Sequence, residues 1–165
     1  MRTAIVITVS DSAFAGDRED LSGPAVADRL DAAGFHIQGS AIVPDERAQI
    51  KDAILDAVPR ANLVVTSGGT GIAHRDITPE VTREVCEKLI EGVSEQMRAQ
   101  GLKHTPLAAL SRGLCGTRGN TLILNLPGSP KGAVESLEAV LDLLPHMIDL
   151  LQGKTGHGEA SAAKR

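Results

Sequence analysis

The segment Ser67-Gly68-Gly69-Thr70-Gly71, here called the glycine loop, is the part of this chain best suited to bind an anion. Its three glycines let the backbone adopt positive φ angles and come close to a ligand. The N–H groups of such a loop can point into one concavity, where the Ser67 and Thr70 hydroxyls add donors. The spacing matches neither the phosphate-binding loop of nucleoside triphosphatases nor the dinucleotide fingerprint. The loop predicts a phosphate-bearing ligand, with a tight turn that binds nothing as the alternative.

Three aspartates stand where a carboxylate can either do chemistry or only organise the chain. Asp76 lies just beyond the glycine loop. It is either a magnesium ligand or base beside phosphates, or an anion favoured by the dipole of the following helix. Asp45 occupies a position typical of a helix N-cap, so capping and chemistry are both open. Asp11, within Ser10-Asp11-Ser12, is placed for function or belongs to a polar turn.

Few other side chains suggest chemistry. Arg75, Arg112 and Lys131 are candidate phosphate partners, or are merely solvated. Asn125 interrupts an apolar run, and a buried amide there needs partners in neighbouring loops or in a substrate. The five histidines form no paired ligand spacing, which disfavours a zinc site. No arrangement of Ser, Cys and His suggests a covalent nucleophile.

Composition narrows the class of protein. The 165 residues predict one domain over residues 1–152 and a flexible C-terminal tail over 153–165. With two Phe, no Tyr and no Trp, the core must be built from Leu, Ile, Val and Ala, and stacking of bases on aromatic rings is largely unavailable. The net charge of −4, with acidic and basic residues mixed, predicts no nucleic-acid or membrane partner.

The cysteines and the N-terminus predict a cytoplasmic protein. Cys86 and Cys115 match no zinc or redox spacing, so we expect two buried reduced thiols, with a disulfide as the alternative. The apolar run at residues 4–7 meets Asp11 too soon for a signal peptide, and no stretch is long enough to span a bilayer.

Short apolar runs alternate with helical periods, which is typical of a mainly parallel sheet covered on both faces. The strands expected are Thr3–Val9, His36–Val43, Leu63–Thr66, and a hairpin of Leu114–Thr117 with Thr121–Leu126. The first helices expected are Pro24–Ala33, Glu46–Val58, and one that is capped by Thr78 with Pro79 in its first turn. Two short helices are expected within Glu91–Ser111, separated near Thr105-Pro106. The last helix is expected to start at Ser129-Pro130 and to be kinked or broken by Pro145.

Four polar or glycine-rich segments each follow the carboxyl end of an expected strand. They are Ser10-Asp11-Ser12, Pro44-Asp45-Glu46, Ser67–Asp76 and Pro127–Lys131. In open α/β sheets ligands bind at that edge. We therefore expect the four segments to converge on one site.

These motifs together resemble the molybdopterin adenylyltransferase family, which includes the gephyrin-type G domains. The resemblance rests on Thr66–Gly71, Arg75-Asp76-x-Thr78-Pro79-Glu80 and Leu126–Pro130. It also takes in Thr8–Ser12, Val43–Glu46, Gly92-x-x-Glu95-Gln96-Met97 and Leu110-Ser111-Arg112, and it covers roughly residues 3 to 151. The chain lacks the molybdate-inserting domain of the fused proteins, so that step would belong to another chain.

The resemblance implies a three-layer α/β/α fold with a mainly parallel central sheet, usually a homotrimer, that acts in molybdenum cofactor synthesis. Its reaction would transfer AMP from ATP to molybdopterin with Mg²⁺ and release pyrophosphate. Asp45 and Asp76 match the family's two critical aspartates and would be catalytic and metal-organising. The nucleotide- and substrate-binding residues would be Ser10, Asp11, Ser12, Ser67, Gly68, Gly69, Thr70, Gly71, Glu95, Ser111, Asn125, Pro127, Gly128 and Ser129.

This chemistry suits the residues. Molybdopterin ends in a phosphate monoester that is mostly dianionic at neutral pH, so it needs no general base. Two other functions stay open from the sequence: a pterin-binding or carrier protein of the related subfamily, which would not depend on both aspartates, and a nucleotide hydrolase. A hydrolase must position a water, and no His or Glu near the glycine loop is an evident candidate for this, with Glu95 left open.

Overall fold

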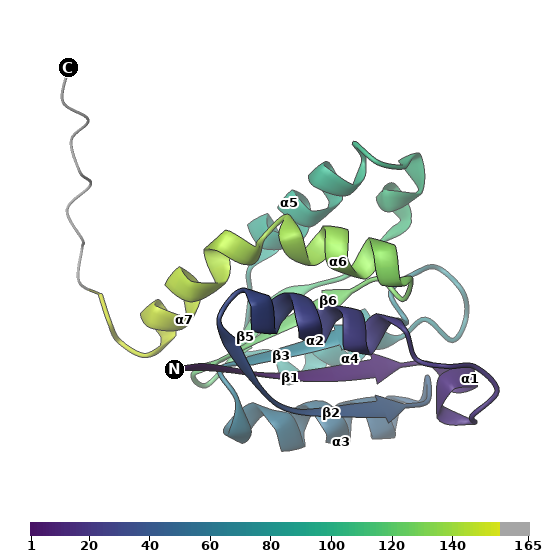
Figure 1. Ribbon diagram of the computed structural model, residues 1–165, viewed down its shortest axis with the longest axis horizontal. Coiled ribbons are helices and arrows are strands. Elements are labelled where there is room, and N and C mark those ends of the chain that lie inside the picture. Colours follow the sequence, from purple (N-terminus) through teal and green to yellow (C-terminus); the bar gives the residue numbers. More distant parts are fainter. Residues whose placement is uncertain (156–165) are drawn as a thin grey trace.

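The structure is a computed structural model that describes residues 1–155, and a six-stranded sheet forms its centre. The strand order is β2 (Phe35–Val43), β1 (Arg2–Val9), β3 (Leu63–Ser67), β6 (Thr121–Leu126), β5 (Cys115–Arg118) and β4 (Lys88–Leu89). The first four of these run parallel, whereas β5 is antiparallel to β6 and β4 to β5. The mainly parallel sheet expected from the sequence is confirmed (Figure 1).

Helices cover both faces of the sheet. The helices are α1 (Asp11–Phe14), α2 (Ser22–Ala32), α3 (Arg47–Ala57), α4 (Thr78–Val85), α5 (Glu91–Gly101), α6 (Pro130–Glu138) and α7 (Leu144–Leu151), with short 3₁₀ turns η1 (Val58–Arg60), η2 (Pro106–Leu110) and η3 (Leu141–Leu143). In Figure 1, α3 lies on one side of the sheet, and α2, α6 and α7 lie on the other.

Each face has its own aliphatic core because successive side chains of a strand point to opposite faces. On β1, Ala4 and Val6 join the core under α2, α5, α6 and α7. Ile5 and Ile7 of the same strand join the core under α3 and α4. A strand buried on both faces must be apolar throughout, as β1 is, and this is why its sequence showed no alternation.

The register brings the carboxyl ends of the parallel strands to one edge. Val9 pairs with Val43, and Ser67 pairs with both Thr8 and Leu126. The convergence of the four strand-end segments is therefore confirmed.

Helix α1 was not expected, α2 begins two residues before the expected Pro24, and α3 begins one residue after the expected Glu46. Two larger differences concern α4 and the last helix. Thr78 does not cap α4: it is the first helical residue, and its hydroxyl donates to the Gly68 carbonyl at 2.9 Å. Pro79 does lie in the first turn of α4. The last helix breaks before Pro145, since α6 ends at Glu138 and η3 intervenes. Pro145 then lies in the first turn of α7, where its missing N–H breaks no helical bond.

Other departures are small. Strand β4 was missed, because two residues give no detectable pattern, whereas the break between α5 and η2 falls where it was expected. Cys86 and Cys115 are both free thiols, as expected, but only Cys115 is buried and Cys86 is half-buried. No helix within residues 1–155 is long and apolar enough to cross a membrane. Most of the tail expected at 153–165 lies outside the described residues.

Candidate active site

The glycine loop is shaped by two residues in positive-φ conformations. Gly68 has φ +109° and Gly69 has φ +68°. A Cβ on Gly68 would lie only 2.2 Å from the Val9 carbonyl oxygen, so only glycine fits beside β1. The N–H of Gly68 donates to the Leu126 carbonyl at 3.0 Å. The N–H groups of Gly69, Thr70 and Gly71 donate to no group among residues 1–155, which leaves them available to an anion.

Neighbouring segments hold the loop in place. The buried Ser67 hydroxyl donates to the Pro127 carbonyl at 2.9 Å, so it ties the loop to the turn after β6. This bond differs from the expected role of Ser67 as a free donor to the ligand. Arg112 holds the other end of the loop, where its Nε donates to the Gly71 carbonyl at 2.8 Å.

Asp11 and Asp45 are joined by a reciprocal pair of hydrogen bonds. The Asp11 N–H donates to Oδ2 of Asp45 at 3.0 Å, and the Asp45 N–H donates to Oδ1 of Asp11 at 2.9 Å. Arg75 donates twice to the Asp11 carboxylate, at 2.6 and 3.0 Å, and once to Glu46 at 2.8 Å. Asp11 therefore connects two strand ends, and its carboxylate is taken up by Arg75.

Neither Asp45 nor Asp76 caps a helix. The cap of α3 is Glu46 and that of α4 is Ile77, and neither cap makes a side-chain bond. Asp76 instead accepts from the Ala73 N–H at 2.9 Å, within its own loop. The capping interpretation of Asp45 is thus wrong in this structure, whereas the position of Asp76 just before α4 still agrees with an anion favoured by the dipole of that helix.

The two carboxylates flank the glycine loop. A Cβ on Gly69 would lie 3.1 Å from Oδ1 of Asp45, and a Cβ on Gly71 would lie 2.8 Å from Oδ2 of Asp76. Glycine at these positions lets the carboxylates approach the backbone whose N–H groups are free. Anion donors and cation ligands therefore stand side by side.

Burial, together with two neighbouring carboxylates, disfavours the ionised form of Asp45. Burial raises the pKa of Asp45 above its ordinary value, and the negative charges of Asp11 and Asp76 act in the same direction. The Arg75 guanidinium, in contrast, holds the pKa of Asp11 below its ordinary value. A cation placed between Asp45 and Asp76 would relieve the repulsion.

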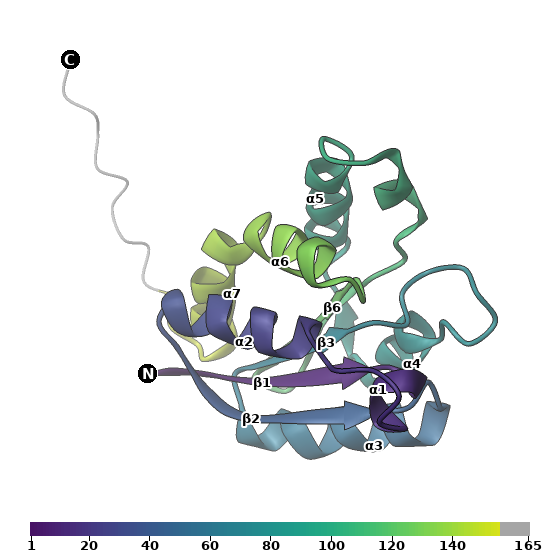
Figure 2. The ribbon, with the colours of Figure 1, turned by 45° about the vertical axis from the view of Figure 1, so that its right-hand side comes forward.

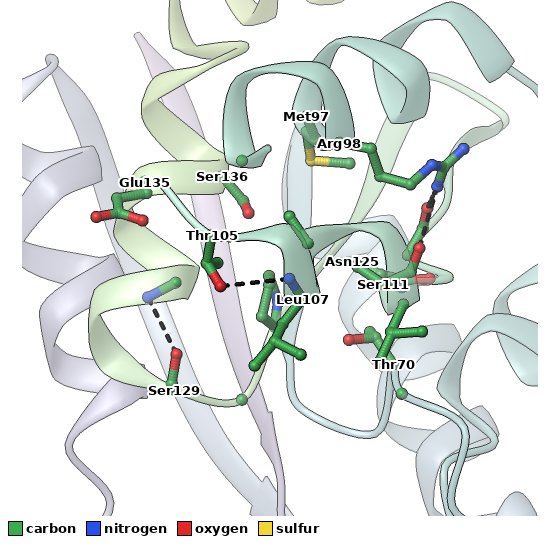
Figure 3. A pocket seen from close by; sticks show the side chains of 18 of the residues that line it. Thr70, Met97, Arg98, Thr105, Leu107, Ser111, Asn125, Ser129, Glu135 and Ser136 are labelled. Atoms are coloured by element: carbon green, nitrogen blue, oxygen red, sulfur yellow. Dashed lines mark hydrogen bonds between the residues drawn. The ribbon is translucent and has the colours of Figure 1, made fainter. Parts of the chain in front are cut away.

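Two pockets adjoin across the glycine loop and share Gly128 and Ser129. The first, which we call the carboxylate pocket, has a volume of about 360 Å³, and its lining includes Asp45, Asp76, Ser10, and Ser67 to Gly69. The second, which we call the α5 pocket, has a volume of about 390 Å³, and its lining includes Thr70, Gly71, Ser111, Asn125 and Pro127. Figure 3 shows this second pocket, with Met97 and Arg98 projecting from α5.

Most of the residues expected at the site line one of these two pockets, but six candidates do not: Asp11, Ser12, Arg75, Glu95, Arg112 and Lys131. Ser12 bonds the Ser10 side chain at 3.3 Å beside the carboxylate pocket. Glu95 on α5 and Arg75 are exposed, whereas Asp11 is half-buried. Asn125 lines the α5 pocket, but its amide is fully engaged by Thr66, Thr82 and Leu114. Asn125 thus serves mainly to join β6 to its neighbours.

Sequence reasoning missed the α5 wall of the second pocket and the α2 wall of the first. Ser94, Met97, Arg98 and Gly101 all line the α5 pocket and follow the i, i+3, i+4, i+7 spacing of one helical face. That spacing was the available signal. Asp20 lines the carboxylate pocket, where its carboxylate accepts from Thr8 and from the Gly23 N–H at the start of α2.

The carboxylates suit magnesium as part of a metal–nucleotide complex. Within residues 1–155 there is no cluster of three or more His, Cys, Asp or Glu that would cage a metal. Magnesium, however, is usually bound by one or two carboxylates together with substrate phosphates and water. Asp45 and Asp76 offer those carboxylates, and the free N–H groups beside them suit the phosphates.

Fold and site together define a class: an α/β protein whose glycine loop and paired aspartates stand at the carboxyl ends of parallel strands, between two pockets. Residues 5–146 match the family described as a probable molybdopterin binding domain. The chain belongs to this family, and the resemblance seen in its motifs is confirmed.

Individual relatives agree. The chain is 44% identical over 155 residues to the molybdopterin adenylyltransferase of Helicobacter pylori, with 90% of this chain and 86% of that protein aligned. The molybdopterin adenylyltransferase of Escherichia coli is 37% identical, with 90% and 84% aligned. A crystal structure of the molybdopterin biosynthesis enzyme MoaB from Thermus thermophilus superposes with a TM-score of 0.88 at 49% identity, covering 93% of this chain and 98% of that one.

Proposed function

We propose that this chain is a molybdopterin adenylyltransferase of molybdenum cofactor biosynthesis. It transfers AMP from ATP to the terminal phosphate of molybdopterin, requires Mg²⁺ and releases pyrophosphate. The observation that carries the proposal is the pair of pockets that adjoin across the glycine loop and share Gly128 and Ser129. Two substrates that each end in phosphate can occupy one pocket apiece and bring their phosphates together at the shared wall. The relatives named adenylyltransferase support this reaction.

The chemistry of the linings supports a different substrate for each pocket. The carboxylate pocket receives the ATP phosphates with magnesium, because Asp45 and Asp76 line it. The α5 pocket receives molybdopterin, because Met97, Leu107 and Leu110 give it apolar surface for the pterin ring while Arg98 offers a positive charge for an anion. The free N–H groups of Gly69 to Gly71 run along the boundary between the two pockets.

The reaction needs alignment and charge neutralisation more than proton transfer. An oxygen of the molybdopterin phosphate forms a bond to the α-phosphorus of ATP, and the bond from that phosphorus to the pyrophosphate oxygen breaks. The attacking phosphate is dianionic, so no general base is required. The glycine-loop N–H groups hold the phosphates and stabilise charge that builds on them. Magnesium held by Asp45 and Asp76 would neutralise the triphosphate and the departing pyrophosphate.

Replacing Asp76 by Asn tests the proposal. We expect AMP transfer to be largely abolished while molybdopterin binding stays measurable, because Asp76 serves the metal–nucleotide side and lies outside the α5 pocket. Product formation is followed by chromatography, and molybdopterin binding by fluorescence. Full turnover by the Asp76→Asn variant would contradict the assignment. Wild-type protein that binds molybdopterin without forming product would instead be the carrier of the related subfamily.

Three finer expectations belong to the same proposal. The protein acts in the cytoplasm, as its cysteines and N-terminal segment predict, and assembles as a homotrimer, as the family resemblance implies. It hands adenylyl-molybdopterin to a separate molybdate-inserting protein. Sedimentation velocity tests the trimer, and a monomer at micromolar concentration would contradict it.

A further inference from the structure

Arg112 lies outside both substrate pockets and makes several hydrogen bonds to the loop between β3 and α4 and to α4 itself. Its backbone N–H donates to the Thr70 carbonyl at 2.9 Å, and its Nε donates to the Gly71 carbonyl at 2.8 Å. Its Nη2 donates to the Asp76 carbonyl at 2.7 Å. Its Nη1 pairs with the Glu80 carboxylate on α4. One side chain thus contacts both ends of the segment from Gly71 to Asp76.

That segment has little other support. Residues 71–76 form no helix or strand, and the Ile72 residue is 71% exposed. Figure 2 shows the connection between β3 and α4 extending away from the sheet. Apart from Arg112, its anchors are the exposed bonds of Arg75 to Asp11 and Glu46, and the contact of Asp76 with Ala73 inside the loop. The backbone at Asp76 is therefore held chiefly by Arg112 and by the start of α4.

The partners of these hydrogen bonds indicate whether Arg112 can bind a substrate phosphate. An arginine that binds a substrate phosphate must present free N–H groups to a pocket. Arg112 lines neither pocket, and each of its three guanidinium nitrogens already donates to a carbonyl or to Glu80. The contacts of Arg112 therefore do not support its interpretation as a phosphate partner, because they are made with the backbone carbonyls of the loop and with Glu80.

We propose that Arg112 is a positioning residue: it holds the Gly71–Asp76 segment so that the Asp76 carboxylate and the free N–H groups of the glycine loop meet the metal–nucleotide complex together. The inference rests on the proposed function of the same site. Arginine is required because its planar fork donates in several fixed directions at once. A lysine at this position has one nitrogen, which cannot keep the bonds to Gly71, Asp76 and Glu80 together.

The test is binding of Mn²⁺, as a spectroscopic substitute for Mg²⁺, in the presence of α,β-methylene-ATP, whose α–β bond cannot be cleaved. Electron paramagnetic resonance counts free Mn²⁺ for the wild type, Arg112→Ala, Arg112→Lys and Asp76→Asn. We expect Arg112→Ala to weaken nucleotide-dependent Mn²⁺ binding about 10- to 100-fold, the usual loss when a residue supporting a ligand is removed. Arg112→Lys should lie between Arg112→Ala and the wild type. Molybdopterin binding should persist in all of them.

Two further variants separate positioning from general stability. Arg118 donates to the Val85 carbonyl at 3.0 Å at the opposite edge of the sheet, so Arg118→Ala removes a comparable bond far from the site and should bind Mn²⁺ like the wild type. Glu80→Gln leaves the bonds from Arg112 to Gly71 and Asp76 and should have a smaller effect than Arg112→Ala. If Arg112→Ala does not fold, Arg112→Lys and Glu80→Gln carry the comparison.

The outcomes also separate this inference from the proposed function. Wild-type Mn²⁺ affinity and turnover in Arg112→Ala, with loss of both in Asp76→Asn, would overturn the positioning role and leave the function standing. A loss in Glu80→Gln as large as that in Arg112→Ala would overturn the assignment to the loop carbonyls. Asp76→Asn that binds Mn²⁺ and transfers AMP normally would instead contradict the proposed function itself.

Discussion

Replacing Gly71 by Ala should damage the site without unfolding the protein. The added Cβ would lie 2.8 Å from Oδ2 of Asp76, whereas ordinary contacts begin near 3.4 Å. The carboxylate must therefore retreat by about 0.6 Å, and misplacement on the scale of 1 Å commonly costs about 100-fold in rate. Gly71 does not have a positive φ, so alanine itself is not strained there.

We expect kcat of Gly71→Ala to fall about 10- to 100-fold. The rotation of Asp76 weakens one hydrogen bond to Ala73, which costs about 1 kcal/mol. For a domain of this size that lowers Tm by about 2–4 °C. The assay is AMP transfer at saturating substrates, with melting followed by circular dichroism.

Gly92→Ala is the matched control. Gly92 lies in α5, and a Cβ there would meet nothing within 4 Å, so the substitution should leave turnover unchanged and slightly favour the helix. Unchanged turnover in Gly71→Ala, or an equal loss in Gly92→Ala, would refute the reasoning that the Gly71 backbone must admit the Asp76 carboxylate.

Two remaining predictions concern titratable groups. Burial raises the pKa of Asp45, so ionisation of Asp45 lowers the stability of the fold as the pH rises above about 3.8. Arg75 lowers the pKa of Asp11, so ionisation of Asp11 raises the stability of the fold above that pH. Asp45→Asn should therefore raise Tm near neutral pH, and Asp11→Asn should lower it. Both differences from the wild type should shrink as the pH is lowered. If calorimetry shows Tm shifts of the same sign for the two variants, the prediction is wrong. Burial raises the pKa of Cys86 to about 11 and that of Cys115 to about 12. At pH 8 only about one thiol in a thousand or fewer is ionised, so iodoacetamide should alkylate them slowly until the protein is denatured, and rapid labelling of the native protein by mass spectrometry would count against buried thiols.

The strands and the place of the site were predictable because burial on two faces and strand direction leave direct marks in the sequence. A run such as Thr3–Val9 is apolar throughout because β1 is covered by helices on both faces. Once the strands are parallel, the segments after them must meet at one edge. The position of Asp45 and Asp76 beside the glycine loop followed from this topology.

The side-chain contacts at the site could not be predicted from the sequence, because they join residues that are distant in the chain. Nothing local shows that Thr78 donates to Gly68 instead of capping α4, or that Arg112 reaches the Asp76 carbonyl 36 residues away. From the sequence, Asp11 is expected to contact a substrate or to belong to a polar turn, whereas its carboxylate is engaged by Arg75, 64 residues later. Side-chain direction at a loop is set by such partners, and residue type alone does not reveal it.

The most direct test of the account is transfer of labelled phosphate by the wild-type protein. The protein is incubated with molybdopterin, Mg²⁺ and ATP carrying ³²P at the α-phosphate. We predict that the label appears in adenylyl-molybdopterin, that pyrophosphate is released in equal amount, and that neither forms when Mg²⁺ or molybdopterin is omitted. Pyrophosphate released without molybdopterin, with the label in free AMP, would contradict the account and indicate a hydrolase.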